Sequence, residues 1–402
     1  MTPVAGSDLL RQMKISDRLL HISAGGNDGW DLYRKSKALI ARGIPVAELT
    51  IGEHDVRTDP SILGAMDAAA RAGHTGYSFG QGNPNLRESV AKRIAERTGT
   101  ATNPGNILIT PGGQAALFNS HMAACSIGDR ALFIDPYYAT YPGTIRSVGA
   151  VPVTVAALPE HGFQPQASAI AAQADGAASL LINSPNNPTC AVYSRETLDG
   201  IARVTKDHDL WLISDEVYDT QVWQGTHISP RSLPDMAERT LVVGSMSKSH
   251  AMTGSRCGWI CGPEEVIQTL LDLTTNTTYG VAGFVQEAAN FALNAGPDLE
   301  TSVGAPFARR RQIALDLLAR QNLVKASPPQ GAMYMLLDIR ATGLSGEEFG
   351  ERLLAERRIA VMPGESFGSA GAGHIRVALT IADDDFAAAF AQVLDFAAQI
   401  VG

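Results

Sequence analysis

Short apolar runs alternate with longer amphipathic segments along the chain. The apolar runs are four or five residues long, as is typical of buried strands, and lie at 106–110, 131–135, 151–155, 179–183, 210–214 and 241–244. Most of the intervening segments have helical spacing: within 83–98, Leu86, Val90 and Ile94 recur every four residues and form one apolar stripe. Strands that alternate with helices in this way require crossover connections. We therefore predict an α/β fold with a mainly parallel sheet between helices.

The pattern changes after about residue 290, where long helical segments dominate. Helices are expected at roughly 300–321, 346–357 and 383–400, with short strands at 333–338, 359–362 and 374–379. A chain of 402 residues is long enough for more than one domain. We expect a large domain at 51–290, a smaller C-terminal α+β domain at 291–402, and an N-terminal segment at 1–50 that joins the smaller domain.

Composition and charge exclude several classes of protein. Hydrophobic residues make up 45% of the chain and charged residues 18%, which is typical of a globular protein. No apolar run is long enough to cross a membrane. The net charge is −9, and Lys and Arg cluster only at 309–311, so nucleic acid is a poor candidate partner. The N-terminus lacks the features of a signal peptide and the four cysteines lack disulfide or metal spacing, so a cytoplasmic location is expected.

Polar or glycine-rich residues follow five of the predicted strands, at the end where a parallel sheet binds ligands. They lie at 111–114, 136–138, 184–188, 215–216 and 245–248. The pair Gly112 and Gly113 stands between a strand and a helix, where free backbone N–H groups suit a phosphate, although a plain turn explains it equally well. The sequence thus predicts one crevice at this edge of the sheet.

Two charged residues at these strand ends suggest a specific chemistry. Lys248 follows Ser-x-Ser, with Arg256 eight residues later, and a lysine in such a place can form a Schiff base with an aldehyde. Asp215 ends an apolar strand, where a carboxylate is costly unless it meets a cation such as a pyridinium nitrogen. Taken singly, each is more often a surface lysine or a capping carboxylate.

The order of the motifs carries a family resemblance. TPGGQAAL, DPYYATYP, NSPNNPT, SDEVY, SMSK with Arg256, and HIR at Arg376 follow one another over nearly the whole chain. In this order they resemble the class I and II aminotransferases, which have the aspartate-aminotransferase-like fold (fold type I) and use pyridoxal 5′-phosphate. No metal-binding motif accompanies them.

This resemblance implies a role for each matching residue around the cofactor ring. Lys248 would bond to the cofactor aldehyde and move the substrate proton, and Asp215 would pair with the protonated pyridine nitrogen. Asn187 and Tyr218 would hydrogen-bond the ring 3-oxygen, and Tyr138 would stack on the ring.

The resemblance also implies a phosphate site and a carboxylate site. The phosphate would be bound by Gly112, Gly113, Gln114, Ser245, Ser247 and Arg256. Tyr77 would reach it from a second subunit, which implies a homodimer with sites shared across the interface. Arg376 would take the substrate carboxylate, aided by Asn187 and the backbone near Gly52.

The chain departs from the family pattern at three places. Many relatives have glycine at Cys190, Pro-Asp-Phe at 54–56 and tryptophan at Ser255. These changes remove no catalytic group, but the resemblance then does not determine which residues contact the substrate. We interpret His54 as a loop residue and not as a catalytic base.

The amino donor is less well defined than the reaction. The stretches at 209–218, 227–240, 245–254 and 373–379 are similar to bacterial arginine–pyruvate transaminases. A guanidinium side chain would need a carboxylate at the crevice mouth, for which the candidates are Asp28, Asp31, Glu53 and Asp55, although each can equally be a solvated loop charge. An acidic donor is disfavoured because no Lys or Arg occurs between Arg256 and Phe307, unless Arg18 supplies the cation.

We therefore predict an enzyme that moves an amino group from an L-amino acid to a 2-oxo acid, such as pyruvate or 2-oxoglutarate, by a ping-pong mechanism. The donor is basic, aromatic or aspartate. The alternative on the same residues is a pyridoxal-phosphate-dependent C–S lyase that acts by β-elimination. A hydrolase is disfavoured, because the GxSxG motif at 364–368 is followed by Gly and Ala and not by a helix.

Overall fold

The computed structural model describes residues 15–23, 30–327 and 329–402, which form one large mixed sheet and two smaller ones. The large sheet has the strand order β2-β8-β7-β6-β5-β3-β4. These strands are β2 (Ile107–Thr110), β3 (Arg130–Asp135), β4 (Val151–Ala156), β5 (Ala177–Asn183), β6 (Trp211–Asp215), β7 (Thr240–Ser245) and β8 (Gly258–Cys261). All six predicted strands are present. The prediction missed β8, a four-residue strand that runs antiparallel between β2 and β7.

The register of the parallel strands brings their polar ends level. Asn183 at the end of β5 pairs with Asp215 at the end of β6, and Asp215 pairs with Val243 of β7. The residues that follow these strands therefore meet at one edge of the sheet, as expected for a ligand site in an open α/β sheet.

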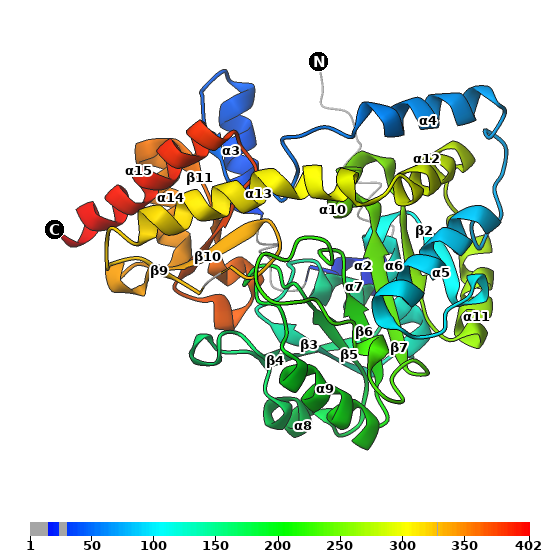
Figure 1. The fold of residues 1–402 in the computed structure, drawn as a ribbon. Helices are drawn as coiled ribbons and strands as arrows, with labels where there is room; N and C mark the ends of the chain where they lie inside the picture. The colour runs from blue at the N-terminus through cyan, green and yellow to red at the C-terminus, as the bar shows by residue number, and fades with distance from the viewer. Residues whose placement is uncertain (1–14, 24–29, 328) are drawn as a thin grey trace, which may run out of the picture.

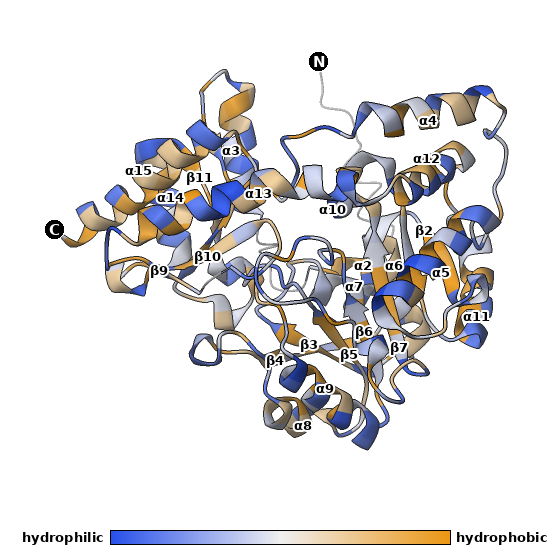
Figure 2. Cartoon of the chain, in the orientation of Figure 1, coloured by the Kyte–Doolittle hydropathy of each residue, from blue (hydrophilic) through white to orange (hydrophobic). Residues whose placement is uncertain are grey.

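Helices cover both faces of this sheet (Figure 1). They are α4 (Pro60–Arg71), α5 (Pro84–Thr98), α6 (Gly112–Ala124), α7 (Tyr141–Ser147), α8 (Ala167–Ala174), α9 (Arg195–Asp207), α11 (Glu264–Thr275) and α12 (Gly283–Asn294). Neighbouring strand residues face opposite ways: Leu180 packs against α8 and α9, whereas Leu181 packs against α6 and α7. Figure 2 shows the resulting pattern, with hydrophobic strands inside and hydrophilic surfaces on α5 and α9.

The C-terminal part contains an antiparallel sheet of order β12-β13-β10-β9. Its strands are β9 (Lys325–Ala326), β10 (Tyr334–Asp338), β12 (Met362–Pro363) and β13 (His374–Ala378), and its helices are α13 (Pro297–Leu318), α14 (Gly346–Arg357) and α15 (Asp383–Val401). Buried phenylalanines of α14 and α15, among them Phe349 and Phe390, form its core. All of the helices predicted beyond residue 290 are present. The predicted strand at 359–362 is two strands, β11 (Ile359–Ala360) and β12, separated by Val361.

The N-terminal segment joins this C-terminal part. Strand β1 (Ala47–Glu48) pairs in parallel with β11, and α3 (Asp31–Ala41) packs on α14. Another short helix, α2 (Asp17–Leu20), lies against α7. Helix α13 runs from the large sheet to the smaller one (Figure 1). The domain boundaries near residues 50 and 290 remain a prediction. Within the described ranges, no helix is long and apolar enough to cross a membrane.

Candidate active site

A cavity of about 280 Å³ opens beyond the ends of β5, β6 and β7. All of the predicted site residues line it except Gly112 and Tyr77. Those on the wall are Gly52, Gly113, Gln114, Tyr138, Asn187, Asp215, Tyr218, Ser245, Ser247, Lys248, Arg256 and Arg376. Residues as far apart in the chain as Gly52 and Arg376 thus meet in one cavity.

Lys248 enters the cavity from α10 (Met246–Ser249), a single turn that follows β7. The Ser245 hydroxyl accepts a hydrogen bond from the Ser247 N–H at 3.1 Å and caps this turn. The Lys248 Nζ donates to the carbonyl oxygen of Gly52. Burial, and next the positive charge of Arg376, lower the pKa of Lys248 to about 8. A neutral, nucleophilic amine is therefore accessible close to neutral pH.

Asp215 ends β6 and is buried against Tyr141. The Tyr141 hydroxyl donates to Oδ2 of Asp215 at 2.7 Å, and the Val217 N–H donates to Oδ1 at 3.3 Å. Burial nevertheless raises the pKa of Asp215 to about 6. A cation placed against this carboxylate would restore its charged form.

Tyr141 is a site residue that was not predicted from the sequence. It is the third tyrosine of the DPYYATYP motif, so the motif carried the signal, but the residue's hydrogen bond to Asp215 depends on how α7 packs. The ring of Tyr138 meets that of Tyr141 edge to face, with centroids 5.8 Å apart. Tyr141 therefore supports both the carboxylate and the ring of Tyr138.

Main-chain groups near the start of α6 lie against Arg256. The start of α6 at Gly112 lies against this arginine: a Cβ on Gly112, whose φ is +79°, would be 2.5 Å from a guanidinium nitrogen. Arg256 donates to the carbonyl of Thr253 at 2.9 Å. The Gln114 side chain bonds Thr140 and Thr144 of the α7 region. Gly112 thus lies behind Arg256 and outside the cavity wall. The start of α6 and the Arg256 guanidinium together suit an anion.

Arg376 on β13 is 1% exposed and held from several sides. Its guanidinium donates to Oδ1 of Asn187 at 2.8 Å and to the carbonyl of Thr50, and its Cζ lies 4.3 Å from the ring centre of Tyr334 and 4.5 Å from that of Phe367. Its buried Nε has no hydrogen-bond partner among the described residues. A fixed guanidinium with a spare donor is suited to a carboxylate.

Tyr334 is a further wall residue that the sequence analysis missed. Its hydroxyl lies 2.9 Å from that of Tyr218, and burial raises the pKa of both phenols. The chain places Tyr334 at the start of a strand predicted at 333–338, and only the packing of the two sheets brings it to the cavity.

The charged residues considered as partners of the donor side chain lie in different places. Glu53 lines the cavity, whereas Asp55 pairs with Arg310 at 2.6 Å and Asp31 pairs with Arg34. Asp28 lies outside the described residues. Arg18, on α2, is not among the residues that line the described wall.

Tyr77 lies away from the cavity, on the surface. Its side chain is 95% exposed and its ring centre is 5.6 Å from that of Tyr279, beside the exposed Phe79. Likewise, Ser366 of the GxSxG motif is not on this wall, and the motif forms a 3₁₀ turn at Gly364–Phe367 in place of a nucleophile elbow.

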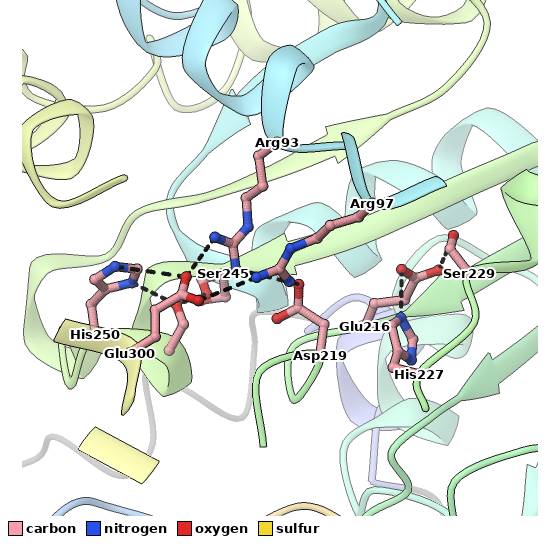
Figure 3. A network of polar contacts seen from close by, with 10 residues as sticks. Arg93, Arg97, Glu216, Asp219, His227, Ser229, Ser245, His250 and Glu300 are labelled. Carbon is pink, nitrogen blue, oxygen red and sulfur yellow. Dashed lines mark hydrogen bonds and ion pairs between the residues drawn. The ribbon is translucent and has the colours of Figure 1, made fainter. Parts of the chain in front are cut away.

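A partly buried charge network lies at the turn that follows β6 (Figure 3). Arg93 and Arg97 of α5 reach Asp219, which follows β6, and Glu300 of α13. Burial alone would raise the pKa of Asp219, but the two arginines hold it below its usual value. His227 lies 3.1 Å from Glu216 in a neighbouring cluster. These contacts tie the turn after Asp215 to α5 and α13.

Comparison with known proteins identifies the family. Residues 44–391 match the family model described as aminotransferase class I and II. The chain belongs to the class I and II aminotransferases. Arginine–pyruvate transaminase AruH of Pseudomonas aeruginosa is 36% identical over 97% of this aminotransferase and 100% of the relative. An aspartate/prephenate aminotransferase of Thermus thermophilus is 35% identical over 90% of this chain and 94% of its own.

Solved structures of aspartate aminotransferases have the same fold as this aminotransferase. Aspartate aminotransferase from Thermus thermophilus with maleate superposes with a TM-score of 0.88 at 33% identity, covering 95% of this chain and 100% of its own. Aspartate aminotransferase from Thermotoga maritima gives a TM-score of 0.89 at 31% identity, covering 95% and 99%. The predicted aspartate-aminotransferase-like fold is confirmed.

The family implies pyridoxal 5′-phosphate as the cofactor of this aminotransferase, and the cavity wall fits that group. A buried amine, that of Lys248, faces the cavity, as an aldehyde requires. A buried carboxylate, that of Asp215, suits a ring nitrogen that carries a proton. The hydroxyls of Ser245 and Ser247 and the guanidinium of Arg256 lie on the same wall and suit the phosphate.

The lowered pKa of Lys248 can be tested in the aminotransferase without its cofactor. An amine-reactive reagent should label Lys248 with a pH midpoint near 8, because the neutral amine reacts and the ammonium does not. Mass spectrometry of the Lys248 peptide measures this midpoint, with the exposed Lys325 peptide followed in the same digest. Arg376→Leu should move the midpoint upward, because it removes a positive charge that lowers the pKa. A wild-type midpoint near the ordinary lysine value of about 10.4 would contradict this account.

Proposed function

We propose that this aminotransferase binds pyridoxal 5′-phosphate in the cavity and transfers an amino group from an L-amino acid to a 2-oxo acid, such as pyruvate or 2-oxoglutarate, in a ping-pong reaction. The convergence of Lys248, Asp215 and Arg376 on one wall is the observation that carries the proposal. When bound, the cofactor supplies an electron-accepting ring for the electrons of the broken Cα–H bond.

Five residues would hold the cofactor ring. Lys248 is the covalent partner of the aldehyde carbon, and Asp215 is the partner of the protonated pyridine nitrogen. Tyr141 supports this second contact from behind Asp215. Asn187 and Tyr218 donate to the ring 3-oxygen. Tyr138 packs on the face of the ring, as implied by the family resemblance.

The phosphate would lie at the start of α6. The residues that would bind it are Gly113, Gln114, Ser245, Ser247 and Arg256, with Gly112 behind them. Backbone N–H groups at the first turn of a helix and a guanidinium both favour an anion, which supports this placement. The φ of +79° at position 112, beside Arg256, favours glycine there.

Lys248 would also move the substrate proton. Its lowered pKa leaves about a tenth of the free amine neutral at pH 7, against well under a thousandth for an ordinary lysine. Arg376, with Asn187 and the backbone of Gly52, holds the substrate carboxylate. This grip fixes the direction of the Cα–H bond, so that the proton leaves toward the Lys248 amine.

The preferred donor would be an amino acid with a basic side chain. The cations on the described part of the wall are Lys248, Arg256 and Arg376, and each already has a role. A second substrate carboxylate would therefore find no free partner there, whereas a cationic side chain would find Glu53. The similarity to an arginine–pyruvate transaminase supports the same choice.

We further propose that the enzyme is a homodimer with shared active sites. Tyr77, Phe79 and Tyr279 are 95%, 67% and 62% exposed and lie on one face, where a subunit interface would remove them from water. By family resemblance, Tyr77 would reach the partner's phosphate. The exposure of Arg256 in the single chain is consistent with a wall that a second subunit completes.

The reaction can be tested by adding single amino acids to the enzyme loaded with cofactor, with no acceptor present. Arginine or lysine should abolish the visible absorbance stoichiometrically, and pyruvate should restore it. Alanine, aspartate, an aromatic amino acid and a cysteine conjugate complete the series. Lys248→Ala is the control, because it lacks the amine that binds the aldehyde.

The outcomes of this test separate the alternatives. Loss of absorbance with aspartate and not with arginine would refute the basic donor but keep the reaction. Persistent absorbance with release of pyruvate and ammonia from the cysteine conjugate would instead identify a C–S lyase. No visible band in the presence of cofactor would refute the role of Lys248.

The dimer is tested by mixing two variants, each impaired at one of the two groups that a shared site needs. Tyr77→Phe and Lys248→Ala subunits, unfolded and refolded together, form a mixed dimer in which one site contains Lys248 with the partner's Tyr77 intact. Activity should rise above that of either variant alone. Sedimentation of the wild type as a monomer, or no gain on mixing, would contradict the shared site.

A further inference from the structure

The helix that carries Lys248 is too short to be stable by itself. Helix α10 has four residues, and a single turn fixes several backbone angles for very few hydrogen bonds. The last carbonyl groups of any helix also have no partner inside it. The position of the Lys248 main chain must therefore depend on contacts from elsewhere in the chain.

Two side chains from distant segments bind the carbonyl oxygen of Lys248. His54 Nε2 and Gln221 Nε2 both lie 3.0 Å from this oxygen. A carbonyl oxygen has two lone pairs, so it accepts both hydrogen bonds at once. His54 precedes α4, whereas Gln221 follows β6, so the two donors approach from different parts of the fold.

The hydrogen bond to the Lys248 carbonyl fixes the tautomer of the His54 imidazole. Because the partner is a carbonyl, His54 Nε2 must carry the hydrogen. Burial, and next the positive charge of Lys248, lower the pKa of His54 to about 4, so the ring is neutral at physiological pH. The ring also packs edge to face on Phe307, with centroids 5.3 Å apart. His54 is not among the residues that line the described cavity wall, so it is not placed to act on the substrate.

We propose that His54 is a positioning residue of this aminotransferase, which acts with Gln221 to hold the main chain of Lys248 by capping the end of α10. This inference rests on the role proposed above for Lys248. It gives a function to a position where many relatives, by the family resemblance, have proline, which offers no side-chain donor.

The segment that carries His54 touches the site at further points. The carbonyl of Gly52 accepts from the Lys248 amine, and that of Thr50 accepts from the Arg376 guanidinium. The Thr58 hydroxyl donates to the carbonyl of Ala251 at 2.6 Å, just beyond α10. His54 thus joins the lysine turn to the same segment that contacts the carboxylate-binding arginine.

The test compares two substitutions of His54 in the holoenzyme. His54→Phe keeps the ring and its contact with Phe307 but removes the donor, whereas His54→Gln keeps an N–H near the position of Nε2. The rate of the first half-reaction should fall about tenfold in His54→Phe with an unchanged donor KM, and His54→Gln should restore most of it. His161→Phe, at an exposed histidine, is the control for the substitution itself.

A second readout does not depend on the loaded enzyme. In the cofactor-free protein, the pH midpoint of Lys248 labelling should rise in His54→Phe, because a displaced turn exposes the amine to water. Removal of a neutral imidazole has no direct charge effect near pH 8, so such a shift reports the position of Lys248.

Three results would overturn the inference. The first is a wild-type half-reaction rate and labelling midpoint in His54→Phe. The second is an equal loss in His54→Phe and His54→Gln, which would show that the donor is irrelevant. The third is a fall in thermal stability alone, which would indicate only a structural role. Failure of the proposed function is distinguishable, because the wild type itself would then show no reaction with any donor.

Discussion

Charged groups buried at the carboxyl edge of the central sheet are the constraint on which this structure depends. Burying a charge is costly unless a partner replaces its water. Asp219 meets Arg93 and Arg97, and Glu216 meets His227. Partners within the protein thus replace the water that would surround these charges.

The residues that face the cavity are satisfied only in part. Asp215 has the Tyr141 hydroxyl but a raised pKa, Lys248 has a lowered pKa, and Arg376 has a buried Nε without a partner in the described chain. A protonated ring nitrogen would stabilise the charged form of Asp215. An aldehyde would react with the Lys248 amine, and a carboxylate would accept a hydrogen bond from Arg376 Nε. This pattern supports the proposal that the cofactor and substrate complete the site.

The sequence predicted the parts of this arrangement that follow from local patterns. Period and length identified β3 and β5, and the motifs placed Asp215 and Lys248 at strand ends, because the chain itself runs from strand to turn. Contacts between distant segments were not predictable in this way. Strand β8 begins with Gly258 and is followed by Gly262, so it lacks the apolar run by which β2, of the same length, was predicted. Tyr141 and Tyr334 reach the site through tertiary packing.

The position of Tyr77 shows another limit. No pattern in one chain reveals the second copy that would cover an exposed tyrosine, so its role comes from the family resemblance and stays a prediction. His54 is the opposite case. Its sequence context is that of a loop residue, and only the folded chain brings its ring to the carbonyl of Lys248.

The central claim is that Asp215 keeps the cofactor ring nitrogen protonated, and the single-turnover rate of Asp215→Ala tests it most directly. We expect the first half-reaction with the best donor to slow by about 10³-fold or more, which corresponds to about 4 kcal/mol of lost transition-state stabilisation. The cofactor affinity should fall much less. A variant that retains the wild-type half-reaction rate while binding the cofactor would contradict the account.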